Sequence, residues 1–376
     1  MKNISLNVSS SRVSLVDRFI LALVGFSSFL IFINAGEDFS YDYIHYLDYF
    51  RLLEESQLSE LIVGLWNMLP LPYVYIPPSG HFEVGFGALV WLLMQLFGSA
   101  PLSYAVIGSF SIMARIWILR NMDVHWGWIA VVNIYAITMF EANAIRLGCG
   151  FTLLLFGLLQ MFRGKSSVHI TTIFIMAGLF HLQTFLWSIF FLVTISGNGM
   201  IIATRLRLTL ATALIFVLCI FAAGGIEQMG YGKLEDYAGV SSGSGGINFV
   251  SALGLLLWAV ALGWLICMPR EMYRLVLGNP RSRAWVATLV AGVPGLALYV
   301  FGTNIGAVGD RTWQVSFMMM AMLALTGDWR RRMGTIEVWL LVVLVLTATI
   351  NVIYRYPLSN FFYPLTPYTE IYSSFF

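Results

Sequence analysis

The sequence predicts an all-α, polytopic integral membrane protein. Of its 376 residues, 59% are hydrophobic and only 11% are charged, whereas soluble domains carry roughly 25% charged residues. The mean hydropathy is +0.81, and long apolar runs recur along the chain at intervals suited to short loops. These runs do not alternate polar and apolar residues as the strands of a membrane β-barrel would. Helices are therefore expected, because they satisfy every backbone polar group within a bilayer.

The apolar runs predict a single transmembrane domain, residues 1–376, with roughly 11–13 membrane-spanning helices. The first run is expected to be an uncleaved span, since it is too long and too aromatic for the apolar region of a signal peptide. The expected spans lie near 17–36, 82–99, 101–119, 125–141, 144–162, 167–181, 183–198, 207–225, 248–268, 285–304, 311–327 and 336–354.

Basic residues between the runs predict the orientation of the helices. Cytoplasmic loops of membrane proteins carry an excess of Lys and Arg. The clear basic loops all fall on one side when the spans between them alternate: Arg163/Lys165, Arg205/Arg207, Arg270–Arg283 and Arg330–Arg332. The opposite, extracytoplasmic side then receives the C-terminal tail and the loops at 140–146, 181–183, 226–247 and 305–311.

The N-terminal part does not fit this alternation. Lys2, Arg12 and Arg18 indicate a cytoplasmic N-terminus, and Arg115 and Arg120 indicate a cytoplasmic loop after the third run. The two runs between those points leave the count of crossings off by one. We therefore expect a re-entrant or partly inserted element within 61–99. The alternative is that Leu61–Ile76 also crosses.

Two segments are not expected to span. An extracytoplasmic segment, 37–81, contains a helix at 40–54 whose aromatic and acidic residues suit the membrane surface. Its apolar stripe is Tyr43, Tyr46, Phe50 and Leu53, with Asp42, His45 and Tyr49 on another face. The loop at 226–247 is rich in Gly and Ser and is expected to be flexible.

Arg146 lies about one turn inside an expected helix, on the side that has no need of a cation. A mid-helix arginine costs roughly 2.5–3.5 kcal/mol, and less near a helix end. One interpretation is a snorkelling arginine paired with Glu141. The other is an anion site in which the guanidinium holds phosphate. The nearby Gly148 and Gly150 would let a neighbouring helix or lipid chain approach closely.

Other ionisable residues gather on the same side of the membrane. His181 ends an apolar run, and an imidazole can take a proton from a sugar hydroxyl. Asp310 and Arg311 precede a later run, where an arginine at a helix start opposes the helix dipole. Each has a simpler explanation in packing or pairing. No nucleotide-binding glycine loop is present.

Two acids, Glu83 and Asp42, lie beside membrane segments. Glu83 opens an apolar run and could favour the helix dipole, and Asp42 could cap a helix. His45 lies near Asp42 and Asp48, but three such residues on one helix are a weak metal signal, and no metal or cofactor is expected.

Together these residues predict an extracytoplasmic site for a phosphorylated lipid. A transporter would place ionisable groups at the bilayer midplane, where this chain has almost none.

At these residues the chain resembles the EpsG/Wzy-like family of bacterial polysaccharide polymerases. The resemblance covers about 38–315. An Asn-x-x-Arg pair, Asn143 and Arg146, is part of the pattern. The motifs are DYIHYLDYF (42–50), FEVGF (82–86), NAIRLGCGFTLLLFGL (143–158), AGLFHLQTFL (177–186) and GDRTWQ (309–314).

The resemblance implies a GT-C-like multi-pass protein of the bacterial inner membrane, with its active site facing the periplasm. Such proteins join undecaprenyl-diphosphate-linked oligosaccharides during O-antigen, capsule or exopolysaccharide assembly. Membrane lipid and a chain-length regulator protein are the implied partners, and nucleic acid is not.

On this basis Arg146 and Arg311 are expected to hold the diphosphate. His181 is the leading candidate for the general base, with Asp42 or Glu83 as rivals. A metal ion is not required once arginines neutralise the leaving group. The alternatives are an O-antigen-type ligase, a membrane acyltransferase, and a flippase or transporter of lipid-linked oligosaccharides.

Overall fold

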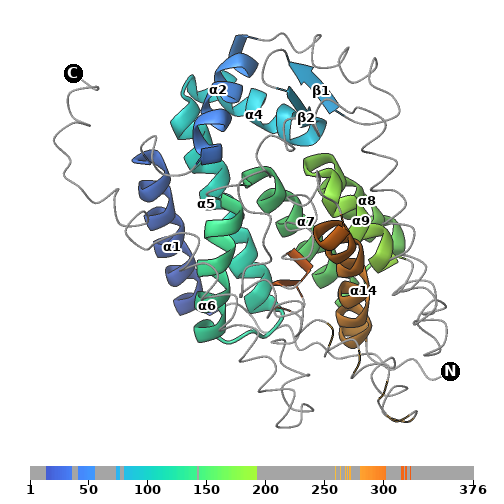
Figure 1. The fold of residues 1–376 in the computed structure, drawn as a ribbon. Coiled ribbons are helices and arrows are strands. Elements are labelled where there is room, and N and C mark those ends of the chain that lie inside the picture. The colour runs from blue at the N-terminus through green and yellow to red at the C-terminus, as the bar shows by residue number, and fades with distance from the viewer. Residues whose placement is uncertain are drawn as a thin grey trace.

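Helices make up almost all of the described chain (Figure 1). The computed structural model describes residues 14–35, 41–55, 73–76, 80–141, 144–192 and 280–301, with single positions between 259 and 271 and between 315 and 322. The elements are α1 (Leu15–Ile33), α2 (Tyr41–Glu55), β1 (Tyr73–Ile76), β2 (Gly80–Glu83), α4 (Val84–Phe97), α5 (Ala100–Asn121), α6 (Trp126–Ala136), the π-helix η2 (Ile137–Glu141), α7 (Ile145–Phe162), α8 (Ser167–Phe180), α9 (Leu182–Phe191) and α14 (Pro280–Phe301).

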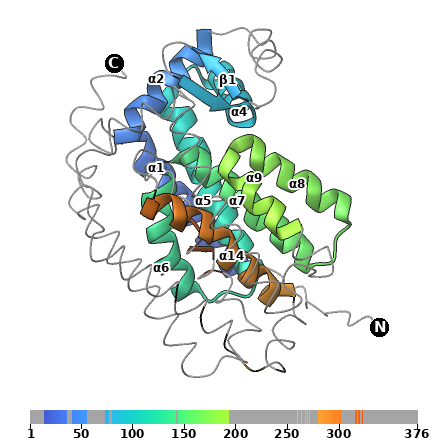
Figure 2. The same cartoon turned by 45° about the vertical axis from the view of Figure 1, so that its right-hand side comes forward.

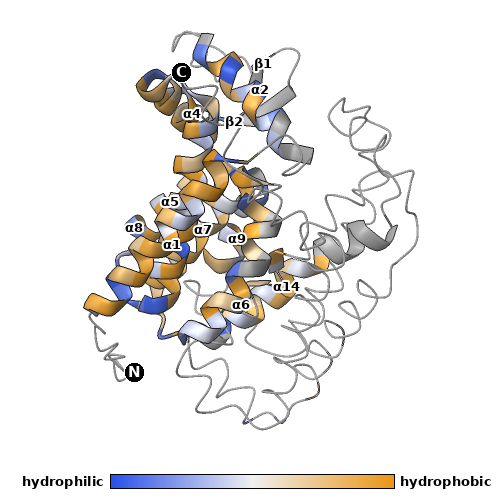
Figure 3. Ribbon diagram, turned by 90° about the vertical axis from the view of Figure 1, so that its left-hand side faces the viewer, coloured by the Kyte–Doolittle hydropathy of each residue, from blue (hydrophilic) through white to orange (hydrophobic). Residues whose placement is uncertain are grey.

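Length and surface chemistry confirm the helical membrane protein that the sequence predicts. Among the described residues, α1, α5 and α7 are long and apolar enough to cross a bilayer. Figure 3 shows hydrophobic residues over most of the length of these helices. One face of α1 exposes large apolar side chains, as a helix surrounded by lipid does: Leu15, Phe19, Leu23 and Phe26. The predicted spans 207–225 and 336–354, and the loop 226–247, lie outside the described residues, so the number of spans stays a prediction.

A short β-hairpin interrupts the otherwise helical described chain. Strands β1 and β2 pair antiparallel, with Tyr73 opposite Glu83 and Ile76 opposite Gly80. The first strand reads YVYI, and Pro77 and Pro78 follow it. Aromatic and β-branched residues favour strands, and proline stops a helix, so the local sequence favours a hairpin here.

The hairpin, α2 and α4 gather at one end of α5 and α7 in both ribbon views (Figures 1 and 2). We call this the site end. Helix α4 has 14 residues and packs against α2 and the hairpin at this end. The chain turns from α4 into α5 through Gly98, which has a φ of 59°, and through Ser99, which caps α5. This geometry favours the expected element in 61–99 that does not cross the membrane.

That arrangement also removes the mismatch in the count of crossings. With α4 kept at the site end, α1 leads to that end and α5 leads away from it, as alternation requires. The outer side of α4 exposes Leu92, Leu96 and Phe97, which suits a helix partly inserted among lipids.

Polar contacts tie α1, α5 and α6 together at the opposite, basic end of the bundle. Asp17 forms a capping box with Ser14. Its carboxylate also accepts hydrogen bonds from Arg120, at 3.2 Å, and from Trp126, at 2.8 Å. Arg163, which follows α7, donates to Asn121. Of the positive charges expected to face the cytoplasm, Arg120 and Arg163 therefore lie at this end, whereas Arg115 is fully buried inside α5.

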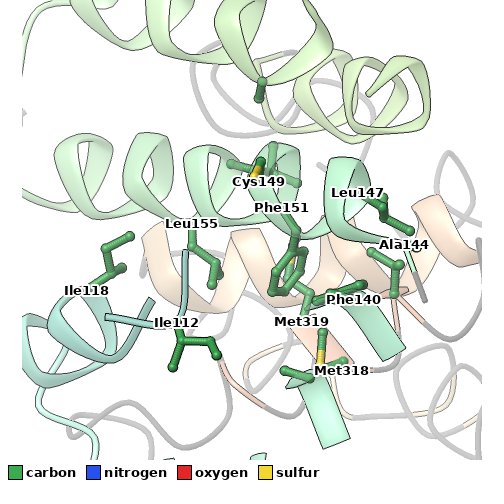
Figure 4. Packing of buried hydrophobic residues seen from close by; sticks show 14 of the residues in the cluster. Ile112, Ile118, Phe140, Ala144, Leu147, Cys149, Phe151, Leu155, Met318 and Met319 are labelled. Atoms are coloured by element: carbon green, nitrogen blue, oxygen red, sulfur yellow. The ribbon is translucent and has the colours of Figure 1, made fainter. Parts of the chain in front are cut away.

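Helix α7 lies at the centre of the core (Figure 4). Phe140 and Phe151 pack with ring centroids 4.9 Å apart, and Met318 and Met319 lie beside them. A Cβ on Gly148 would lie 2.8 Å from the Cβ of Phe140, and one on Gly150 would lie 3.1 Å from the carbonyl oxygen of Ala177. The predicted close approach of neighbouring helices to these glycines is confirmed.

The contact at Gly148 leads to a stability prediction. Gly148→Ala is expected to destabilise the protein by roughly 1–3 kcal/mol, because the new methyl group overpacks a tight contact with η2. Gly127→Ala is the matched control, since its Cβ would lie 3.4 Å from His125 Nδ1, an ordinary contact distance. Thermal unfolding in detergent measures both. Equal melting temperatures for the two variants would contradict the prediction.

Candidate functional site

Four side chains from four elements meet at the site end of the bundle. They are Tyr46 of α2, Glu83 at the end of β2, Arg146 in the first turn of α7, and His181 between α8 and α9. Arg146 Nη1 donates to Glu83 Oε2 at 2.5 Å, and its Nε donates to the Tyr46 hydroxyl at 3.2 Å. His181 Nε2 lies 4.0 Å from Glu83 Oε1. The structure therefore brings together three residues that the sequence singled out.

Glu83 occupies the centre of this cluster. It is the N-cap residue of α4, yet its side chain makes no capping hydrogen bond. The carboxylate instead faces Arg146 and His181, with a side chain only 5% exposed. A role limited to favouring the start of α4 therefore does not explain its position.

Arg146 is held on two sides. Its guanidinium carbon lies 5.8 Å from the centre of the Tyr46 ring, besides the hydrogen bond to the hydroxyl of that tyrosine. Its side chain is 12% exposed. A charge-assisted hydrogen bond to Glu83 and the aromatic face offset the cost of holding this cation near the end of an apolar helix.

His181 joins two helices and has a defined tautomer. It ends α8 and caps α9, where its Nδ1 accepts a hydrogen bond from the backbone N–H of Gln183 at 3.3 Å. In a neutral imidazole, one nitrogen accepts and the other carries the proton. The proton therefore lies on Nε2, the nitrogen that faces Glu83.

Helix α2 supplies Tyr46 from a buried aromatic face. The predicted stripe of Tyr43, Tyr46, Phe50 and Leu53 is buried, and Tyr43 packs edge-on against Tyr104 with ring centroids 4.8 Å apart. Burial raises the pKa of Tyr43 to about 12. Tyr49 was expected on another face but is also fully buried. Helix α2 therefore buries a wider aromatic face against α4 and α5 than a helix lying on the membrane surface would.

Of the remaining predicted site residues, the structure describes the side chain of His45 alone. His45 is exposed on the outer face of α2, as are Asp48 and Arg51. The backbone of Asp42 lies in α2, but its side chain lies outside the description, as do Asn143, Asp310 and Arg311. Among described residues, no group of three or more His, Cys, Asp or Glu is arranged to hold a metal ion.

A second polar network lies deeper, and it overturns the pairing of Arg146 with Glu141. Glu141 binds Arg115 in a two-pronged ion pair, with N–O distances of 2.9 and 2.8 Å and both side chains fully buried. Arg115 Nε also donates to Asn133, and Ser111 donates to Glu141. The expectation that mid-span charges are nearly absent is therefore wrong, although the two charges neutralise each other.

Sequence reasoning missed Tyr46 as the partner of Arg146, and it missed the Arg115–Glu141 pair. The helical spacing on α2 could indicate that Tyr46 is buried, but not what its hydroxyl binds. An arginine four residues after a serine, in the run SIMAR, was the available signal that α5 has a polar face.

Comparison with known proteins identifies the family of the chain. The EpsG family profile matches residues 19–369. The chain belongs to the EpsG family. This EpsG-family protein is thus a helical membrane protein of the polysaccharide-polymerase type, and Tyr46, Glu83, Arg146 and His181 all lie in the matched range. No curated protein and no solved structure was found to match the EpsG-family chain.

Proposed function

We propose that this EpsG-family protein is a glycosyltransferase that polymerises oligosaccharide units carried on undecaprenyl diphosphate. The cluster of Arg146, Glu83 and His181 carries the proposal, because it combines a guanidinium for an anionic leaving group with a carboxylate and an imidazole for proton transfer. The site end lies opposite Arg120, Arg163 and Lys165. By the positive-inside rule, this supports an active site on the periplasmic face of the bacterial inner membrane.

In the proposed reaction, Arg146 binds the diphosphate of the growing chain. A guanidinium presents five N–H donors in a fork that matches phosphate oxygens. The anion then competes with Glu83 for the same cation. Arg311 is proposed as a second diphosphate ligand, and Asn143 and Asp310 are the polar residues beside these two arginines in the sequence.

The bond changes follow from this binding. A hydroxyl of the acceptor unit attacks the anomeric carbon of the donor glycan, and a new C–O bond forms there. The bond to the diphosphate breaks, and the diphosphate leaves with the electron pair while Arg146 stabilises the growing charge. The hydroxyl proton passes to a base on the protein.

We assign that base to Glu83. A carboxylate can accept a proton directly, whereas the Nε2 of His181 already carries one when Nδ1 accepts from Gln183. Binding of diphosphate to Arg146 would leave Glu83 to act on the acceptor. His181 then orients the carboxylate. Asp42 remains a rival because it lies on the helix that supplies Tyr46.

The product of a purified protein tests the proposed function. Reconstituted with a lipid-linked repeat unit as its single substrate, the protein is expected to yield a ladder of longer glycans on the same lipid. In cells without the gene, single lipid-linked units are expected to accumulate on the periplasmic side. Accumulation on the cytoplasmic side would instead indicate a flippase, and full-length glycan left on its carrier would indicate a ligase.

Arg146→Lys is expected to lower polymerisation by roughly 10²-fold, since a point charge replaces a fork that binds two oxygens at once. The ladder assay on reconstituted protein measures this rate. Arg51→Lys is the matched control, because Arg51 is exposed on α2 and pairs only with Asp48 in the described structure. Full activity of Arg146→Lys would contradict the diphosphate role.

A further inference from the structure

A cavity of about 720 Å³ lies between α5 and α7, bounded by described residues. Its volume falls within the range of roughly 300–1,000 Å³ that is typical of ligand pockets. Carbon atoms form nearly all of its wall, including Phe110, Trp117, Leu153, Phe156 and Phe180.

The few polar groups in the wall are engaged elsewhere. Ser111 donates to Glu141 at 2.9 Å and lies 3.2 Å from the hydroxyl of Thr152. The hydroxyls of Ser111 and Thr152 therefore belong to the hydrogen-bond network of Arg115 and Glu141. An apolar chain fits such a cavity, whereas a sugar would find too few hydrogen-bond partners.

The cavity begins directly beneath the candidate site. Cys149, Leu153 and Phe156 follow Arg146 by three, seven and ten residues, so they share its face of α7. The first of them lies about 4.5 Å along the helix axis from Arg146. Phe180, at the same end of the cavity, directly precedes His181.

From there the cavity runs along the bundle toward the basic end. Its wall on α5 extends from Ile107 to Ile118, a rise of about 16 Å. Leu21 of α1 and Trp117 lie near the far end, close to the contacts of Asp17 and Arg120. An ionic site and a long apolar cavity are thus continuous along one helix face.

We propose that this cavity binds the isoprenoid units nearest the diphosphate of the lipid-linked substrate. The inference rests on the proposed function, because it takes the anion at Arg146 to be a diphosphate that bears such a chain. A chain attached to a phosphate at Arg146 must leave along a neighbouring surface, and the cavity offers an apolar one within a helical turn. Binding of the chain there would fix the reacting end of the lipid against Arg146 and Glu83.

Photo-crosslinking tests the cavity without requiring turnover. The probes are polyprenyl phosphates that carry a diazirine in one of the isoprene units nearest the phosphate, added to full-length protein in lipid nanodiscs. Crosslinks are expected within 107–118 and 149–156, and excess polyprenyl phosphate should remove them while phosphatidylglycerol should not. Mass spectrometry of the digested protein locates the labelled peptides.

Two substitutions of alanine by phenylalanine supply a test variant and its matched control. Ala114 lines the cavity, whereas Ala22 is exposed on α1. Ala114→Phe should reduce crosslinking in the two segments by roughly tenfold, because the added ring occupies part of the volume that the isoprenoid chain would fill. Ala22→Phe should leave the crosslinking unchanged. If Ala114→Phe does not fold, as judged by its melting curve, Leu153→Phe fills the same cavity and carries the test.

The failures of the two proposals are distinguishable. Labels spread over the exposed face of α1, or removed equally by phosphatidylglycerol, would mean bulk lipid only and would overturn the cavity assignment even if the protein polymerises glycans. Specific labelling of the cavity in a protein that makes no ladder would support the lipid site and overturn the polymerase function.

Discussion

Glu83→Gln is expected to lower the rate of polymerisation by roughly 10²–10⁴-fold, the range that general acid–base catalysis contributes. The substitution keeps the size of the side chain and a hydrogen-bond acceptor for Arg146, but it removes the group that takes the proton. The rate of glycan extension at saturating lipid-linked substrate, measured on reconstituted protein, is the direct readout.

The pH profile separates Glu83 from His181 as the base. The Glu83→Gln variant should lose the acidic limb of the profile of kcat/KM, because that limb reports protonation of the base in the free enzyme. His181→Asn should keep the limb and lose less activity. An asparagine oxygen can still accept the N–H of Gln183 and cap α9, so the backbone at this junction is preserved.

The reverse result would return the role of base to His181. In that case His181→Asn would abolish the acidic limb and Glu83→Gln would retain it. If both variants retain the acidic limb, the base is neither Glu83 nor His181, and Asp42 becomes the leading candidate. Melting curves of the variants are a necessary control, since Glu83 neutralises a nearly buried arginine and its loss also affects stability.

The apolar runs of the sequence predict the positions of most of the described helices. The run at 144–162 became α7 at Ile145–Phe162, and that at 167–181 became α8 at Ser167–Phe180. The lengths of such runs are imposed by the bilayer, so they are local properties of the sequence. Charge counting likewise placed Glu83, Arg146 and His181 at the same end of the helices, which the structure bears out as a cluster.

The details that escaped prediction depend on contacts between distant segments. Arg115 was taken to indicate the cytoplasmic end of its span because its charge alone does not reveal depth, and its partner Glu141 lies 26 residues away. The hairpin β1–β2 lies in a segment whose residues suit both a strand and an apolar span. Tyr46 meets Arg146 across 100 residues, and no periodicity in α2 encodes that partner.

Removal of either partner of the Arg115–Glu141 pair is expected to destabilise the protein by about 3–5 kcal/mol, because the remaining charge is left buried without compensation. Arg115→Met leaves the carboxylate of Glu141 with the hydroxyl of Ser111 but without its cation, and Glu141→Gln leaves Arg115 with a neutral acceptor. A denaturant titration in mixed micelles measures the free energy of unfolding of both variants. Arg51→Met, which breaks the exposed pair with Asp48, is the matched control and should change stability little.

The double variant tests whether charge balance, and not shape, causes the loss. With both charges removed, Arg115→Met/Glu141→Gln should be more stable than either single variant, since replacing a buried ion pair by neutral groups is often nearly neutral. A double-mutant cycle then gives the coupling between the two residues. Equal destabilisation of the single and double variants would mean that packing alone holds this region.

The pair also bears on catalysis through its position in the chain. Glu141 ends η2, five residues before Arg146, and Tyr104 holds its backbone carbonyl by a hydrogen bond. Loss of the Arg115 contact should therefore loosen the start of α7 and misplace the guanidinium. We expect the single variants to weaken substrate binding at temperatures where they remain folded, and the double variant to recover part of it. Full binding affinity in a folded Arg115→Met protein would show that the start of α7 is held by other contacts.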